Sequence, residues 1–148
     1  MTSKAMRISA LIRTLGLAQR AQADAWVRQS GLTRAQAVSL GFIEENQERG
    51  VIAREVAEMS GTTPASVASL LQGLEERGYL TRSPSPRDSR VKLLRVTQEG
   101  SRLVSGFDRD MGAAQERVLS VLSPAEQGEL IALLERVATS IGTPPHAT

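Results

Sequence analysis

Cysteine is absent from the sequence, and histidine occurs once, as His146 in the polar C-terminal stretch. The lack of cysteine excludes disulfides, thiolate metal ligands and cysteine nucleophiles. One histidine without neighbouring ligands supplies neither a metal site nor a Ser-His-Asp catalytic set. The sequence therefore indicates no metal, no cofactor and no catalytic site, and we expect a protein that is not an enzyme.

Aromatic residues and long apolar runs are also scarce. Aromatics make up 3% of the 148 residues and hydrophobic residues 41%, so the core has to consist of Leu, Val, Ala and Ile. That mixture favours packed helices over a large sheet. No stretch approaches the roughly 20 apolar residues that cross a bilayer, and arginines interrupt the N-terminal stretch from Met1 to Leu17. We expect a cytoplasmic protein without membrane contact.

Hydrophobic periodicity and capping signals predict helices at about 6–29, 34–48, 52–60, 64–77, 98–122 and 124–141. The third and fourth are short and are separated by a turn containing Gly61, which is the helix-turn-helix pattern. The period then changes. A strand over 79–82, a turn-rich tip over 83–89 and a returning strand over 90–96 predict a hairpin, the candidate wing.

These elements predict a mainly α fold with a small β-hairpin wing, a winged helix-turn-helix whose N- and C-terminal helices form a dimerisation region. Segment 33–97 can close its own small core, so the amphipathic helices outside it need another surface to bury against. A coiled-coil seam, a dimer interface and an intramolecular core are all consistent with their apolar stripes. We expect an N-terminal dimerisation helix (1–32), a DNA-binding lobe (33–97), C-terminal dimerisation helices (98–142) and a flexible tail (143–148).

Positive charge lies in two blocks, although the formal net charge is only +2. The segment up to Arg34 carries six basic residues against Asp24, and the segment from Arg77 to Arg95 carries six against Asp88. Seven glutamates fall between the two blocks. Local basic blocks suit a polyanionic partner such as duplex DNA.

One joined pattern resembles the MarR family of bacterial transcriptional regulators. Its specific part is the helix-turn-helix followed by LEERGYLTR at 74–82, DSR at 88–90 and LRVTQEG at 94–100. Flanking helices of matching size and order extend the resemblance over nearly the whole chain. It implies a homodimer in which the first and last helices of both subunits intertwine. It also implies that a small ligand can release the protein from DNA.

Two sets of residues are candidates for contacting DNA. Short polar residues on the fourth helix can reach bases or phosphates, and basic residues of the wing can enter a minor groove or grip a phosphate. We expect Asp88 to support the wing, as the Asp-x-Arg pattern of the family implies. Solvated surface is the alternative for both sets. The candidates are Thr62, Thr63, Ser66, Ser69, Gln72, Arg82, Arg87, Arg90 and Lys92.

Two features modify this expectation. Relatives often have arginine where this chain has Ser69, and Gly73 weakens the fourth helix by about 1 kcal/mol relative to alanine. Base readout by this helix is therefore expected to be weak, which leaves more specificity to DNA shape and the wing. Trp26, the only tryptophan, either lines an effector pocket or fills core.

The sequence thus predicts a homodimeric repressor that binds double-stranded DNA at an inverted-repeat operator and is relieved by a small-molecule effector. The alternative is a winged-helix protein-interaction module that uses the same fold without binding DNA. The basic wing favours the DNA-binding hypothesis.

Overall fold

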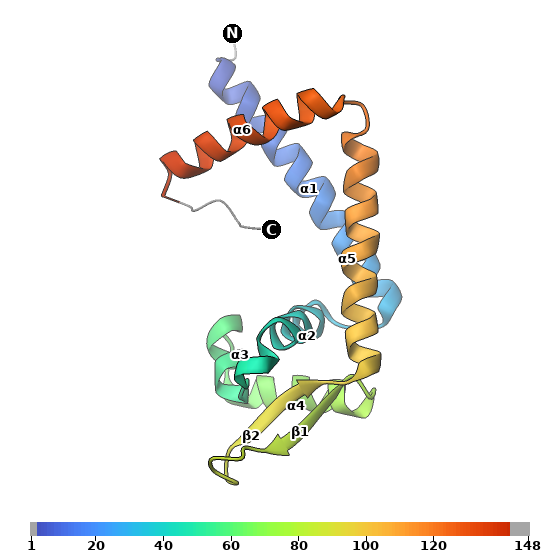
Figure 1. Ribbon diagram of the computed structural model, residues 1–148, viewed down its shortest axis with the longest axis vertical. Helices are drawn as coiled ribbons and strands as arrows, with labels where there is room; N and C mark the ends of the chain where they lie inside the picture. Colours follow the sequence, from blue (N-terminus) through green and yellow to red (C-terminus); the bar gives the residue numbers. More distant parts are fainter. Residues whose placement is uncertain (1–2, 143–148) are drawn as a thin grey trace. The chain divides into compact units, whose positions relative to one another are not determined.

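The computed structural model describes residues 3–142 (Figure 1). His146 and the predicted tail lie outside the described residues. The chain divides after Met111 into two compact units. The described part is mainly helical, with one two-stranded antiparallel sheet. Its elements are α1 (Lys4–Ser30), α2 (Arg34–Asn46), the short 3-10 helix η1 (Gln47–Arg49), α3 (Ala53–Ser60), α4 (Pro64–Glu76), β1 (Leu80–Pro84), β2 (Lys92–Val96), α5 (Gln98–Leu119) and α6 (Pro124–Ser140).

The predicted helix boundaries are confirmed where short-range capping sets them. Thr33 and Gln36 form a capping box at the start of α2, and Ser123 and Glu126 form another at α6. These bonds satisfy backbone N–H groups that have no partner inside the helix. Gly31 ends α1 with φ 73°, a left-handed conformation that glycine adopts without steric cost.

Two helices end earlier than predicted. After Asn46 the chain tightens into η1 and turns at Gly50, whose φ is 83°. This turn brings Val51 against β2, where it forms an isolated bridge with Leu94. The long helix α5 ends at Leu119. The side chain of Gln127 donates to the carbonyl oxygens of Leu119 and Leu122 and so holds the turn that follows.

The hairpin forms as predicted, but its tip lies two residues later in the sequence. Leu80 pairs with Val96 and Pro84 with Lys92, so β1 extends two residues beyond the predicted strand and β2 begins two residues later. Proline is tolerated at Pro84 because β1 is an edge strand. The returning strand starts late because residues 88–91 form a turn closed by the Val91 N–H donating to the Asp88 carbonyl oxygen, at 3.0 Å.

One core unites α2, α3, α4 and the hairpin, which lie together in Figure 1. The segment predicted to close its own core supplies nearly all of the buried side chains, and only two come from α1 and the turn after it. A Cβ at Gly73 would lie 2.7 Å from Nε2 of Gln36, the end of a flexible side chain that would have to shift. The core consists of Val27, Leu32, Leu40, Ile43, Val51, Val56, Ala57, Val67, Leu71, Leu74, Leu80 and Leu94.

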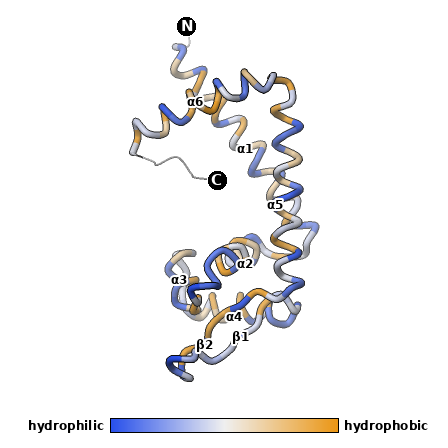
Figure 2. Tube along the Cα trace, viewed as in Figure 1, coloured by the Kyte–Doolittle hydropathy of each residue, from blue (hydrophilic) through white to orange (hydrophobic). Residues whose placement is uncertain are grey.

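Large apolar side chains remain exposed along the terminal helices, and orange positions recur on α1 and on α6 in Figure 2. On α1 the exposed fraction of Leu11 is 57% and that of Leu15 is 49%. On α6 it is 57% for Ile131 and 56% for Val137. Within residues 3–142, no helix combines the length and apolarity needed to cross a bilayer.

Candidate nucleic-acid interface

The helix-turn-helix consists of α3, a three-residue turn and α4. Gly61 takes a left-handed conformation with φ 63°, which ends α3. Thr63 caps α4 through its side-chain oxygen, which accepts from the Ser66 N–H, and Pro64 occupies the first turn, where its missing N–H costs nothing. The predicted boundary between the two helices is therefore confirmed.

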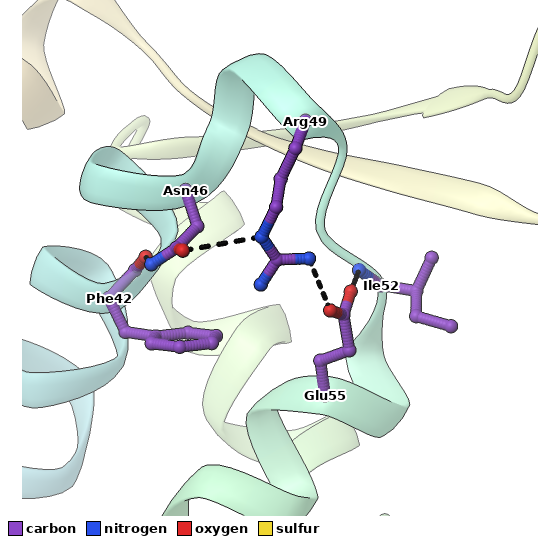
Figure 3. Close-up of polar contacts among 5 residues, drawn as sticks. All are labelled: Phe42, Asn46, Arg49, Ile52 and Glu55. Carbon is purple, nitrogen blue, oxygen red and sulfur yellow. Dashed lines mark hydrogen bonds and ion pairs between the residues drawn. The ribbon is translucent and has the colours of Figure 1, made fainter.

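The start of α3 is held by a polar network that the sequence did not indicate (Figure 3). Glu55 accepts hydrogen bonds from the Ile52 N–H and from the Arg49 guanidinium, and Arg49 also donates to Asn46. The hydrogen bond from Arg49 lowers the pKa of Glu55 below its usual value, and the Ile52 N–H adds to this effect. The network ties η1 to the first turn of α3 and so orients the helix-turn-helix.

Recognition-helix candidates occupy the outer face of α4. Val67, Leu71 and Leu74 face the core, and their helical spacing leaves the polar positions between them exposed. Ser66, Ser69 and Gln72 are exposed on α4, and Thr62 and Thr63 are exposed in the turn before it.

Several of these side chains are already hydrogen-bonded to one another or to neighbours. Thr63 Oγ1 lies 2.9 Å from Ser66 Oγ, and Thr62 Oγ1 lies 3.0 Å from Ser60 Oγ. Gln72 donates to Glu76 at 3.0 Å. Hydroxyl groups can rotate toward a new acceptor, and the amide nitrogen of Gln72 keeps a second N–H that its bond to Glu76 does not use.

Basic side chains gather at the wing. Arg87, Arg90 and Lys92 are exposed, and none has an ion-pair partner among residues 3–142. The turn bearing them is hydrophilic in Figure 2. Asp88 orders it through the backbone, because its Oδ1 accepts from the Arg90 N–H at 3.0 Å. The contact is made to the backbone of Arg90 and not to its guanidinium, and it fixes the backbone from which Arg90 projects.

Arg82 differs from the other predicted wing cations. Its Nη2 lies 2.9 Å from Oε2 of Glu75 at the end of α4, and its Nε donates to the same oxygen at 3.0 Å. Only 32% of the Arg82 side chain is exposed. The pair therefore connects β1 to α4. Sequence reasoning missed Glu75 as its partner, since the two residues lie on different elements.

Trp26 is half-buried and both packs on the core and lines a cavity of about 510 Å³. The Phe107 ring meets it edge to face, with centroids 5.1 Å apart. The indole Nε1 donates to Asp110 at 3.0 Å, which fixes the ring orientation. The cavity volume falls in the range of small-molecule sites.

The segment that contains the helix-turn-helix and the wing turn is similar in sequence to a known protein family. The MarR family model matches residues 30–91. The chain is 30% identical over 110 residues to the uncharacterized HTH-type transcriptional regulator YybA of Bacillus subtilis, covering 74% of this chain and 72% of the relative. The chain belongs to the MarR family.

Two further transcription regulators resemble the chain over most of its length. The HTH-type transcriptional repressor Rv2887 of Mycobacterium tuberculosis is 27% identical over 129 residues, covering 87% of this chain and 91% of the relative. The structure of MepR, a transcription regulator of the Staphylococcus aureus multidrug efflux pump MepA, superposes with TM-score 0.80 at 26% identity, covering 90% of this chain and 97% of MepR. A MepR–DNA complex gives TM-score 0.75 at 26% identity, covering 90% and 98%.

MarR membership and the helical fold with its hairpin identify a transcriptional regulator with a winged helix-turn-helix, and not an enzyme. The family model covers α2, α3, α4, β1 and the wing turn, which carry all of the predicted DNA-contacting side chains except Lys92, the first residue of β2. The fold class expected from periodicity is thereby confirmed.

Proposed function

We propose that this MarR-type regulator is a cytoplasmic homodimeric repressor that binds an inverted-repeat operator and leaves it when a small molecule occupies the Trp26 cavity. The observation that carries the proposal is the set of exposed wing cations beside an exposed polar face of α4. A surface of this composition suits a phosphate backbone and the edges of bases. The DNA complex of MepR supports the same use of the fold.

The two parts of the surface have different tasks. Arg87, Arg90 and Lys92 have free charges, so they supply phosphate contacts or enter a narrow minor groove. Short hydroxyl side chains at the start of α4 contact the backbone or bases, while Gln72 is the one long side chain on that face that can pair with adenine. Arg82 holds the wing against α4 through Glu75, and its remaining nitrogen, Nη1, is available for a phosphate.

The exposed apolar stripes of the terminal helices support dimerisation. A chain that leaves Leu11 and Leu15 on α1 and Ile131 and Val137 on α6 about half exposed has large apolar surfaces to bury. A second copy of the chain can cover them in a two-fold assembly. Two wings and two α4 helices related by such an axis match the symmetry of an inverted repeat.

Repression relieved by a ligand rests on two further observations. The relative Rv2887 is named a repressor, and the Trp26 cavity lies between α1, α2 and α5 at the edge of the core. A ligand that binds the DNA-free form more tightly than the DNA-bound form lowers operator occupancy.

Fluorescence anisotropy tests the DNA-binding proposal, with a duplex that the protein itself enriches from random-sequence DNA. Arg90→Ala should weaken binding by about 1–3 kcal/mol for a lost base contact. Arg109→Ala removes the same charge from an exposed residue of α5 already paired with Asp110, and should bind like the wild type. The logarithm of affinity should fall with the logarithm of salt concentration by about 0.9 per phosphate contact.

The opposite result supports the other candidate. If Arg90→Ala matches wild type and the affinity does not depend on salt, the wing does not meet DNA. The protein-interaction module then becomes the better description of this fold.

A further inference from the structure

The Trp26 cavity has an uneven charge distribution. Among the described residues that line it, four carry carboxylates, Asp24, Glu44, Glu45 and Asp108, and Arg34 is the one cation. Arg34 is already paired with Asp24 at 2.8 Å. Glu45 and Asp108 have no hydrogen-bond or ion-pair partner within residues 3–142. Three carboxylates are therefore left without a positive partner around one cavity.

Apolar and aromatic side chains form the rest of the wall. Trp26, Phe42, Leu103, Val104 and Phe107 surround the same space. A flat hydrophobic body can lie against them, and an indole face attracts a cation in addition to the carboxylates. The Asp110 bond holds the indole in place without a ligand, so the ring needs no reorganisation before binding.

Glu44 connects this cavity to the wing. It is half-buried, and its Oε1 accepts from Ser101 Oγ of α5 at 2.7 Å. Its Oε2 accepts from Nε2 of Gln47 at 3.1 Å. The Oε1 of Gln47 in turn accepts from the backbone N–H of Val96, the last residue of β2, at 3.0 Å. One carboxylate thus lines the cavity and also orients the amide that holds the base of the wing.

We propose that the Trp26 cavity binds an organic cation with an aromatic body, and that Glu44 transmits its binding to the wing through Gln47 and Val96. The proposal rests on the proposed function, because it names the effector class and the route of control. Without ligand, the Glu44 carboxylate bonds to Ser101 and Gln47. With the cation bound, the carboxylate turns toward it and the Gln47 amide loses its acceptor.

That exchange changes the wing for a simple reason. The Gln47 side chain is positioned from both ends, by Glu44 at its nitrogen and by Val96 at its oxygen. When the Glu44 bond is lost, the amide gains rotational freedom and the bond to Val96 weakens. When the Val96 N–H is held less firmly, the wing can take more orientations relative to the core. Fewer molecules then present Arg90 in the geometry that binds DNA.

An anionic aromatic ligand is disfavoured by the same geometry. Its charge would lie beside three carboxylates that have no positive partner, and Arg34 is occupied by Asp24. Repulsion from the half-buried Glu44 is the strongest of the three, because water screens the exposed Glu45 and Asp108 more effectively. The charge of the ligand is therefore the variable to test.

Trp26 provides the measurement, because it is the only tryptophan and lies in the cavity wall. Full-length protein is titrated with three probes that share one body: biphenylmethyl trimethylammonium, biphenylmethanol and biphenylcarboxylate. Affinities are measured from the quenching of tryptophan emission. The cation should bind about tenfold or more tightly than the alcohol, and the carboxylate should bind most weakly. Equal affinities, or tightest binding by the carboxylate, overturn the assigned ligand class.

Two variants separate charge from coupling. Glu45→Gln removes an exposed lining carboxylate outside the route to the wing, so it should weaken binding of the cation while a saturating dose still lowers DNA affinity. Gln47→Ala keeps every carboxylate of the cavity wall and removes the bond that Glu44 has to give up, so the cation should quench Trp26 with an affinity equal to or higher than in wild type. Its DNA affinity should no longer respond to the cation, whatever its starting value.

The outcomes distinguish this proposal from the one on which it rests. If the protein binds the enriched duplex and the cation neither quenches Trp26 nor releases DNA, the ligand proposal fails and the DNA-binding function stands. If the cation binds and Gln47→Ala responds to it as strongly as wild type, the route through Glu44 is wrong. Loss of all DNA binding in ligand-free wild type refutes the proposed function instead.

Discussion

Gly100, in the first turn of α5, joins that helix to the base of the wing at very short range. A Cβ at this position would lie 2.4 Å from the Tyr79 carbonyl oxygen and 2.6 Å from Cγ1 of Val96. The Tyr79 oxygen cannot easily move, because it accepts from the Thr97 N–H at 3.0 Å. Gly100→Ala should therefore separate α5 from the strands on which the wing stands.

The size of the effect follows from three contributions. Overpacking a filled site costs about 1–3 kcal/mol, and disturbing the hydrogen bond to Tyr79 adds about 1 kcal/mol. Alanine in place of glycine returns about 1 kcal/mol of helix propensity. We expect the free energy of unfolding to fall by about 1–3 kcal/mol in total.

Gly112 offers a matched control in the same helix. A Cβ there meets no atom within 4 Å, so Gly112→Ala gains helix propensity without a clash. Urea unfolding, followed by far-ultraviolet circular dichroism at one fixed protein concentration, compares both variants with wild type. Gly112→Ala should be equal to or more stable than wild type. If Gly100→Ala is stabilised to the same extent as Gly112→Ala, the close approach of Tyr79 is refuted.

Three further predictions concern stability and assembly. Ser39 is 1% exposed and its hydroxyl has no hydrogen-bond partner within residues 3–142. Ser39→Ala should therefore leave the free energy of unfolding in urea unchanged or raise it by about 1 kcal/mol, and a decrease of about 1 kcal/mol would contradict an unpaired hydroxyl. The lowered pKa of Glu55 means that its ionised form stabilises the fold above the ordinary glutamate pKa, and this contribution disappears as pH falls through the lowered value. The stability difference between wild type and Glu55→Gln should therefore shrink between about pH 7 and about pH 3 in urea titrations, and a difference independent of pH would refute the contact with Arg49. Leu15→Glu charges an exposed position of α1 and should shift sedimentation equilibrium at micromolar concentration toward a folded monomer, whereas an unchanged dimer would place the interface elsewhere.

The helix starts at Thr33, Thr63 and Ser123 can be predicted from the sequence because each cap bonds within one helical turn. The helix ends at Gly31 and Gly61 can be predicted for a similar reason, since a left-handed residue at a helix end is a local requirement. The helix-turn-helix and the hairpin followed from changes of hydrophobic period, and the exposed face of α4 followed from the spacing of Val67, Leu71 and Leu74. The boundaries that moved, at η1 and at the tip of the hairpin, depend on contacts with other elements.

The tertiary structure alone decided which charged side chains are free and which are engaged. Arg82 and Arg90 look equivalent along the sequence, but only Arg82 meets Glu75, because the end of α4 lies beside β1. Glu44 stands beside Glu45 in the sequence, and nothing in that local pattern indicates its partners. It accepts from Ser101, which lies 57 residues away, and Gln47 accepts from the Val96 N–H across 49 residues. Such contacts have no sequence period, since they arise only when packing of the core brings distant elements within hydrogen-bond distance.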